Sequence, residues 1–250
     1  MMSENRPVRK SLRSILLVNW SKFGVQHINV EGSVLFTGVN GSGKSTMLDA
    51  MMYVVTGNTT FNVAAQDRDR TVLSYVRGDT KSKGAYRYLR NGEVVSYIAM
   101  EFDSPMDSST FVVGVCIESR DEQEQKSLWF VRNHASINDF NFYQKYGTKL
   151  SVTPRQSLCC KGEKFKAQDF LKKEQGVRQI MRMMGLRGID MREYRGKLLK
   201  MLAFKPENHI DHFIRDCVLQ EHKIETIPQL QEQKLKYDEL LEFYSHSTCK

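Results

Sequence analysis

A glycine-rich stretch between two apolar segments carries the most specific chemistry in the sequence. Residues 38–46 read Gly-Val-Asn-Gly-Ser-Gly-Lys-Ser-Thr and match the pattern G-x-x-x-x-G-K-[ST]. Glycines let the backbone curl so that successive N–H groups point at phosphate oxygens, and the N-terminus of a following helix adds a positive dipole end. The stretch therefore predicts a site for nucleotide phosphates.

Two side chains in this stretch have distinct roles. Lys44 would reach the β- and γ-phosphates of ATP as a point charge, and the Ser45 hydroxyl would complete the ligand shell of Mg²⁺. The flanking residues supply the context that the pattern requires. Ser33–Thr37 predicts a short apolar strand, and Thr46–Val55 predicts a buried helix because it is rich in methionine, leucine and valine.

Composition narrows the class of protein. The chain has 250 residues, 40% of them hydrophobic and 26% charged, which is ordinary for a soluble globular protein. No apolar run approaches the ~20 residues that a membrane span needs, and residues 1–13 show no secretory signal. The five cysteines are odd in number and lack a C-x-x-C pair, so a metal or redox role for Cys159 and Cys160 is disfavoured. We expect a cytoplasmic protein with reduced thiols.

Positive charge is concentrated in one part of the chain. The net charge is +8, and residues 161–205 hold 13 Lys or Arg against 5 Asp or Glu, an excess as large as that of the whole chain. Such a cluster is either a solvated surface or a surface that contacts the phosphate backbone of nucleic acid. The two interpretations have similar weight from the sequence alone.

The segment before the glycine-rich stretch predicts further strands. Residues 15–18 are apolar, residues 21–24 form a turn, and residues 26–30 alternate. Three strands leading into a P-loop favour an ATPase head of the ABC type, because small nucleotide kinases usually place the P-loop after their first strand.

The middle of the chain predicts an antiparallel sheet. Residues 71–76 predict a short helix, and Tyr86–Asp103 predicts a hairpin with Asn91-Gly92 at its turn. Residues 111–118 and 127–132 predict further strands. The first of these imitates a Walker B strand, but Glu118 is followed by Ser119 rather than by a catalytic glutamate. We therefore reject it as a magnesium-binding strand, and no LSGGQ-like stretch is present in the chain.

The last hundred residues predict helices. One spans residues 166–184 with Gly185 closing it, a second spans 190–204, and Asn208 caps a third. Beyond residue 225, large side chains recur at heptad spacing, which indicates either the root of a coiled coil or an ordinary amphipathic helix (Ile227, Leu230, Lys234, Tyr237, Leu241 and Tyr244).

The predicted fold class is thus α/β. It comprises the N-terminal lobe of an ABC/SMC-type P-loop ATPase head with antiparallel hairpins (residues 1–150), a basic helical lobe (151–224) and the start of a coiled coil (225–250).

This order of elements resembles the N-terminal half of an SMC-like ATPase head. The chain is most similar to the SMC-like (JetC) subunits of Wadjet plasmid-defence systems, which are related to the bacterial condensin MukB. The stretches that carry the similarity are Leu17–Trp20, Thr37–Asp49, Arg70–Gly78, Tyr88–Gly92, Ser96–Ala99 and Leu202–Pro206.

The resemblance implies a function. In that family two heads sandwich two ATP molecules, a C-terminal half supplies the Walker B acids and signature motif, and the ATP cycle extrudes DNA loops for a partner nuclease. It also implies kleisin-type partners, contacts to double-stranded DNA through the backbone, and a nucleoid-associated location. The residues carried over as ATP and Mg²⁺ contacts are Asn40, Gly41, Ser42, Gly43, Lys44, Ser45 and Thr46, with Ser21 and Lys22 near the adenine.

One family position is not matched, and two other functions stay open. No glutamine stands at residues 204–208, where the family has its glutamine loop. A self-sufficient P-loop kinase would use Arg68, Arg70 and Arg77 as lid arginines, and a non-catalytic interaction module would use ATP only to stabilise its fold. We expect ATPase activity only when a C-terminal half completes a head dimer, so whether this chain alone is an enzyme stays open.

Overall fold

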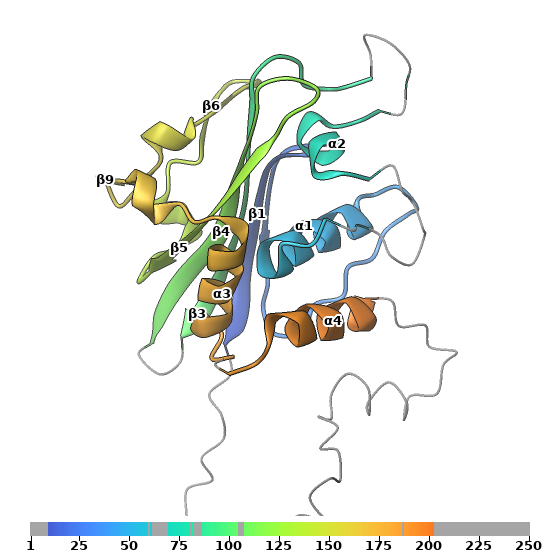
Figure 1. Ribbon diagram of the computed structural model, residues 1–250. Coiled ribbons are helices and arrows are strands. Elements are labelled where there is room, and N and C mark those ends of the chain that lie inside the picture. Colours follow the sequence, from blue (N-terminus) through green and yellow to red (C-terminus); the bar gives the residue numbers. More distant parts are fainter. Residues whose placement is uncertain are drawn as a thin grey trace, which may run out of the picture. The chain divides into compact units, whose positions relative to one another are not determined.

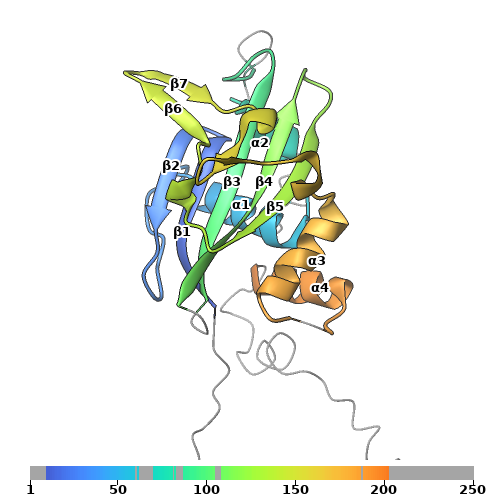
Figure 2. The ribbon, with the colours of Figure 1, turned by 90° about the vertical axis from the view of Figure 1, so that its left-hand side faces the viewer.

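A five-stranded antiparallel sheet organises this chain. The computed structural model describes residues 10–59, 61, 70–80, 82, 87–104, 108–186 and 188–202. The strand order is β2-β1-β3-β4-β5, and every neighbouring pair is antiparallel (Figures 1 and 2). The strands are β1 (Ser11–Trp20), β2 (Phe23–Asn29), β3 (Val94–Ser104), β4 (Ser109–Ser119) and β5 (Lys126–Asn133). The sheet belongs to the compact unit of residues 1–195; residues 196–250 form a second unit.

Both faces of the sheet are covered. Three helices pack on one face, and two small hairpins with three 3₁₀ turns pack on the other (Figures 1 and 2). The helices are α1 (Lys44–Thr56), α2 (Val72–Arg77) and α3 (Lys173–Met183). The opposite layer contains β6 (Tyr143–Tyr146), β7 (Lys149–Val152), β8 (Cys159–Cys160), β9 (Glu163–Lys164), η3 (Ile137–Asp139), η4 (Arg155–Ser157) and η5 (Ala167–Asp169). A further helix, α4 (Met191–Leu202), crosses from the first unit into the second.

This two-sided burial explains why the central strands are continuous apolar runs. In a strand, successive side chains point to opposite faces. Ile15 and Leu17 accordingly belong to the core on the helix side, while Leu16 and Val18 belong to the core on the hairpin side. The strands predicted at residues 15–18, 26–30, 111–118 and 127–132 are confirmed as β1, β2, β4 and β5, and the predicted helices near the P-loop and at 71–76 as α1 and α2.

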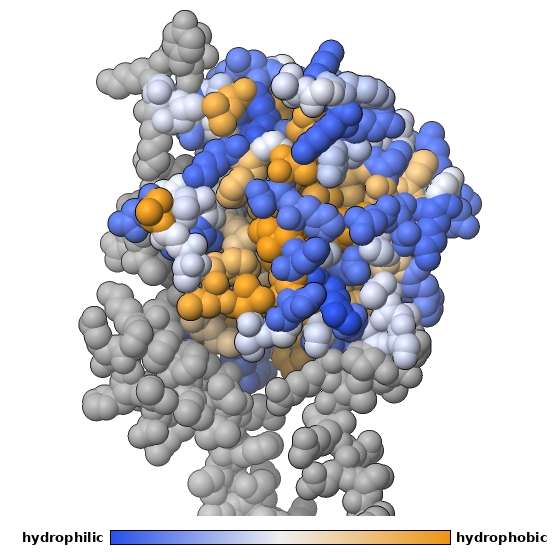
Figure 3. Space-filling model, turned by 180° about the vertical axis from the view of Figure 1, so that it is seen from behind, coloured by the Kyte–Doolittle hydropathy of each residue, from blue (hydrophilic) through white to orange (hydrophobic). Residues whose placement is uncertain are grey.

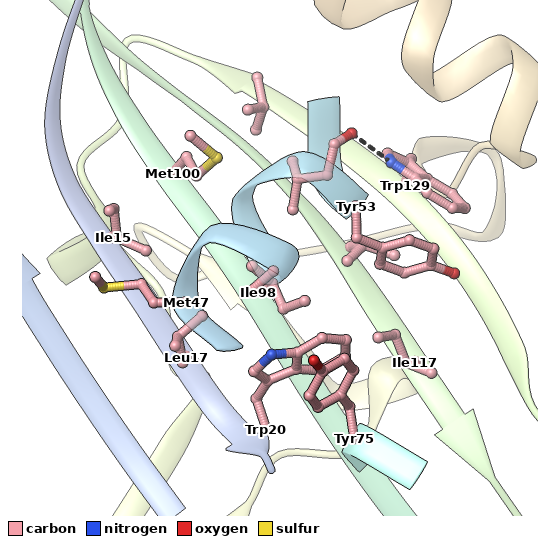
Figure 4. Packing of buried hydrophobic residues seen from close by; sticks show 14 of the residues in the cluster. Ile15, Leu17, Trp20, Met47, Tyr53, Tyr75, Ile98, Met100, Ile117 and Trp129 are labelled. Atoms are coloured by element: carbon pink, nitrogen blue, oxygen red, sulfur yellow. Dashed lines mark hydrogen bonds between the residues drawn. The ribbon is translucent and has the colours of Figure 1, made fainter. Parts of the chain in front are cut away.

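The core on the helix side contains several aromatic side chains among its aliphatic ones (Figure 4). The rings of Trp20 and Tyr75 stack with their centroids 4.6 Å apart. Trp129 on β5 donates its indole N–H to the Val54 carbonyl near the end of α1, at 2.9 Å. Because buried indole N–H groups need an acceptor, this bond fixes where the C-terminal end of α1 meets the sheet.

The predicted hairpin across Tyr86–Asp103 is wrong. Its second half is β3, but β3 pairs with β1 on one edge and β4 on the other, so neither edge is available to residues 87–90. Those residues instead pair with the end of α2: Leu89 and Arg90 donate their amides to the carbonyls of Gly78 and Arg77. Asn91-Gly92 is still a turn, but it connects this short pairing to the central sheet.

The helix predicted at 166–184 begins later, at Lys173. Phe170 is buried in the core on the hairpin side, whereas Ile180 is buried in the core on the helix side. The chain must therefore pass around the edge of β5, and it does so at Leu171, which exchanges backbone hydrogen bonds with Trp129. A helix cannot continue through residues whose backbone groups pair with a strand.

Several predictions concern residues outside the described ranges. The helix capped by Asn208, the heptad segment beyond 225 and the glutamine-loop position at 204–208 all lie there. The predicted helix at 190–204 is confirmed over Met191–Leu202. The proposed division at residues 150 and 224 stays a prediction.

The contact between α3 and β5 gives a stability prediction. A Cβ added at Gly176 would lie 2.2 Å from the Cβ of Trp129. We expect Gly176→Ala to lower the free energy of unfolding by about 1–3 kcal/mol, because overpacking outweighs the better helix propensity of alanine. Gly196, also inside a helix, has nothing within 4 Å of an added Cβ, so Gly196→Ala should be neutral or stabilising by up to about 1 kcal/mol. Urea unfolding of both variants checks this, and equal effects would contradict it.

Candidate functional site

The glycine-rich stretch forms a turn that leads directly into α1. The helix begins at Lys44, and Gly43 caps it with a φ of 106°. A Cβ on Gly43 would lie 2.5 Å from the Phe23 ring, so only glycine fits between this turn and β2. Residues 37–42 and Ser45 are exposed, whereas Lys44 and Thr46 are half-buried. The predicted residues from Asn40 to Thr46 therefore form one continuous, accessible loop and helix start.

The strand predicted at Ser33–Thr37 is wrong. Residues 33–37 carry no helix or strand, and Val34 and Leu35 are 45% and 84% exposed. In a sheet this segment would need a neighbour, but the strands β1, β3 and β4 are paired on both edges, and residues 33–37 do not pair with the outer edge of β2 or β5. The apolar pattern of a strand is present, and a partner strand among the described residues is not.

The two ends of α1 differ in how their backbone groups are bonded. At the C-terminal end, the Val54 carbonyl accepts from Trp129, the Thr56 carbonyl accepts from Arg195 at 2.6 Å, and the Tyr53 carbonyl accepts from Gly57. At the N-terminal end, the first intrahelical bond runs from Met47 to Gly43. The amides of Lys44, Ser45 and Thr46 have no acceptor within the described part of the chain. These open amides and the helix dipole favour an anion.

Two ammonium groups lie on the same loop. Lys44 donates to the carbonyls of Gly38 at 2.6 Å and Val39 at 3.1 Å. Lys22, from the turn between β1 and β2, donates to the Gly41 carbonyl at 2.5 Å. The structure thus places Lys22, and with it the turn that holds Ser21, beside the P-loop. The contact of Ser21 and Lys22 with the adenine, which the family resemblance implies, stays a prediction. Open amides, two ammonium groups and the exposed Ser45 hydroxyl fit a magnesium–nucleotide phosphate group.

Trp20 ties the start of α1 to the sheet. It is fully buried at the end of β1 (Figure 4). Its indole N–H donates to the Thr46 carbonyl at 3.0 Å. The bond uses a carbonyl of the first helical turn and leaves the amides of that turn open. Trp20 lies in one of the stretches that carry the family resemblance, but no role was predicted for it, because a tryptophan at the end of an apolar strand is typical of an ordinary core residue.

A buried carboxylate on α1 was also missed. Asp49 accepts a hydrogen bond from the Tyr75 hydroxyl at 2.5 Å, and Arg70 lies 3.5 Å from the same carboxylate oxygen. Burial and the Asp49 carboxylate raise the pKa of Tyr75 above its ordinary value, so its hydroxyl stays a donor. The signal was available, since an acid inside an otherwise apolar helix needs a buried partner.

Two of the three arginines considered as lid residues, Arg70 and Arg77, are bonded to other side chains or to the backbone. Arg77 is 1% exposed, and its guanidinium donates to Ser119 and to the carbonyls of Asp121, Arg90 and Gly92. Arg70 is bound to Asp49 and Tyr75. Arg68 lies outside the described residues.

The rejected Walker B candidate has a structural role. Glu118 lies near the end of β4, a central antiparallel strand, and pairs with Arg155 at 2.9 Å. Among the described residues, no group of three or more His, Cys, Asp or Glu side chains could hold a metal ion. No described helix is long and apolar enough to cross a membrane.

A comparison with known protein families matches the region around the glycine-rich loop. A family model described as the P-loop-containing region of AAA domain matches residues 12–68. This is a P-loop nucleotide-binding region. The match spans β1, β2, the glycine-rich loop and α1, which are the elements that build the site described above. Comparison with curated proteins gives no match. The chain therefore contains a P-loop ATPase-like domain of mixed α/β structure with a mainly antiparallel sheet.

The Asp49–Tyr75 bond gives a second prediction. Tyr75→Phe removes a hydrogen bond to a buried carboxylate, so we expect it to lower the free energy of unfolding by about 1.5–3 kcal/mol. Tyr53→Phe is the matched control, because the Tyr53 hydroxyl donates to the neutral Ser127 hydroxyl at 2.8 Å and should cost about 0.5–1.5 kcal/mol. Chemical denaturation measures both. A smaller loss in Tyr75→Phe than in Tyr53→Phe would show that the carboxylate does not depend on this bond.

Proposed function

We propose that this chain is the ATP-binding N-terminal portion of an SMC-like ATPase head. A C-terminal half supplies the acids and the signature motif, and a head dimer hydrolyses ATP. By the family resemblance, the complete machine translocates DNA in bacterial defence against plasmids, together with kleisin-type and nuclease subunits.

The observation that carries the proposal is the segment before the P-loop. Residues 33–37 have the composition of a strand, yet within the described part of the chain they form no backbone hydrogen bonds, and they expose Val34 and Leu35. Apolar residues also reach the surface on the face seen in Figure 3. An extended apolar segment with unpaired amides and carbonyls is a template for another strand. We assign that strand to the C-terminal half of the head.

The carboxylates of the described residues also support a head in which this chain binds ATP and the C-terminal half supplies the acids for hydrolysis. Asp49 is bound by Tyr75 and Arg70, and Glu118 is bound by Arg155. Neither carboxylate is available to orient a water molecule for attack on a phosphate. The described residues thus supply positive charge and amide donors for binding, while hydrolysis needs an acid from another segment.

The kinase alternative is less well supported. It requires arginines that move over the phosphates, but Arg77 is buried with its donors bound, and Arg70 is held by Asp49. The non-catalytic module shares every feature of the binding site. Only turnover in the presence of a C-terminal half separates it from the proposed ATPase.

The basic segment supports a contact with DNA. Eight of its cationic side chains in the described part of the first unit are exposed: Lys161, Lys164, Lys166, Lys172, Lys173, Arg178, Arg182 and Arg192. Among them, only Lys161 has an ion pair within the described residues, at 3.6 Å from Asp139. Exposed cations without acidic partners can neutralise backbone phosphates without reading base sequence.

ATP binding and turnover test the proposal directly. We expect the purified chain to bind a fluorescent ATP analogue and Lys44→Ala to weaken that binding at least about tenfold, since a charge-assisted phosphate contact contributes about 1.5–3 kcal/mol. Hydrolysis should stay at background until the C-terminal half is supplied. Turnover by the chain alone that is lost in Lys44→Ala would refute the proposed division.

The strand pairing has its own control. Leu35→Asp should leave ATP binding by the isolated chain intact, because this side chain is 84% exposed. It should impair hydrolysis with the C-terminal half, since a carboxylate would be buried in the new sheet. Unchanged hydrolysis would remove residues 33–37 from the interface.

Salt dependence tests the DNA contact. The logarithm of the association constant for duplex DNA should fall with the logarithm of salt concentration, with a slope of about −0.9 per phosphate contacted. Replacing Arg178 and Arg182 on α3 with glutamine should make the slope shallower by about 1–2. Replacing Lys145 and Lys149 on the β6–β7 hairpin removes the same charge elsewhere and should change the slope less. Equal changes in both double variants would show that only net charge matters.

A further inference from the structure

A half-buried arginine outside the P-loop, Arg90, holds the turn that contacts the P-loop. The Arg90 guanidinium donates four hydrogen bonds, three of them to the turn between β1 and β2. Its Nε donates to the Asn19 side chain at 3.0 Å, and its two terminal nitrogens donate to the carbonyls of Ser21 at 2.9 Å and Phe23 at 2.8 Å. The fourth bond, to the Val76 carbonyl at 3.0 Å, fastens the same group to α2.

The acceptors show what this guanidinium does. All four are uncharged oxygens, so Arg90 is not a partner for an acid, and burial lowers its pKa to about 10. The turn that it binds has an uncommon backbone, because Asn19 and Ser21 both have positive φ values, 54° and 51°. Such conformations persist where surrounding bonds hold them. The planar fork of arginine donors can hold several carbonyls at once.

The other side of this turn faces the P-loop. Lys22, between the two carbonyls held by Arg90, donates to the Gly41 carbonyl, and the Phe23 ring lies against Gly43. The Ser21 amide is also fixed, since it donates to the Tyr75 carbonyl at 2.6 Å. The turn is thus bonded on one side to Arg90 and α2 and on the other side to the loop at the start of α1.

We propose that Arg90 is a positioning residue for nucleotide binding, acting through Lys22. This rests on the proposed function, because it assumes that the P-loop binds ATP. Within the described part of the chain, Arg90 makes no hydrogen bond to the P-loop. Its hydrogen bonds fix the position of the β1–β2 turn, and Lys22 extends from that turn to the P-loop. Lys22 then adds a second ammonium group beside Lys44, at a site whose amides are already open to anions.

Arg77, which is fully buried, provides a control. Its acceptors are also uncharged, but they are the Ser119 hydroxyl and the carbonyls of Asp121, Gly92 and Arg90 itself, and none of them belongs to the β1–β2 turn. Arg77→Lys and Arg90→Lys each replace a guanidinium that donates four hydrogen bonds with an ammonium group that can donate fewer. They should therefore destabilise the fold by similar amounts, while only Arg90→Lys displaces Lys22.

The test is a double-mutant cycle with a fluorescent ATP analogue. We expect Lys22→Ala and Arg90→Lys each to weaken binding about fivefold, the scale of one modest hydrogen bond. The double variant should be no weaker than either single variant, because both changes remove the same contact. Arg77→Lys should bind as the wild type does, and thermal unfolding should show comparable losses of stability in the two arginine variants.

Every outcome is informative. Multiplicative effects in the cycle, or equal weakening by Arg77→Lys, would overturn the positioning role and leave ATP binding intact. Absence of binding by the wild type would instead remove the proposed function. If Arg90→Lys does not fold, Asn19→Gly removes one acceptor of Arg90 and tolerates the positive φ. It should give a smaller loss that disappears in the Lys22→Ala background, and a loss that persists there would overturn the proposal.

Discussion

The start of α1 is subject to a constraint that the rest of the structure satisfies. Its first amides must stay unpaired to receive an anion, yet the helix must not move. Carbonyls therefore carry the anchoring bonds: Trp20 binds the Thr46 carbonyl at one end, and Trp129 and Arg195 bind the Val54 and Thr56 carbonyls at the other. Because both tryptophans are buried in the sheet, the antiparallel strands hold the helix in place and leave its donors open.

Polar side chains inside the molecule extend this arrangement to the neighbouring turn. Burying a charged group without hydrogen bonds is costly, so each buried charge here has several partners. Asp49 links α1 to α2, Arg77 links α2 to β4 and the turn before β3, and Arg90 links α2 to the β1–β2 turn. The short helix α2 is the common member of these bonds. Through these bonds α2 is connected to the sheet, to α1 after the P-loop and, through Arg90, to the β1–β2 turn beside the P-loop.

Much of the site could be predicted because its signals are local. The glycine-rich pattern, the apolar helix after it and the capped helix at Val72–Arg77 depend on neighbouring residues, and each is found where expected. Errors arose where distant segments compete for the same backbone groups. Asn91-Gly92 has the sequence of a hairpin turn, but β3 has no free edge for the second strand of a hairpin. Phe170 was predicted to be helical, but it is buried on the hairpin side, so α3 begins only at Lys173.

The amino-acid sequence by itself determined the phosphate-binding loop, because the loop's conformation depends on glycines at set spacing and on the helix that follows. It also determined most strands, since burial on both faces leaves an apolar run in each. Only the tertiary structure decided that Trp20 bonds to the start of α1, that Asp49 bonds to Tyr75, that Arg90 bonds to the β1–β2 turn, and that residues 33–37 stay unpaired among the described residues. Those outcomes depend on which groups far apart along the chain meet as donor and acceptor, and no spacing within the sequence specifies that.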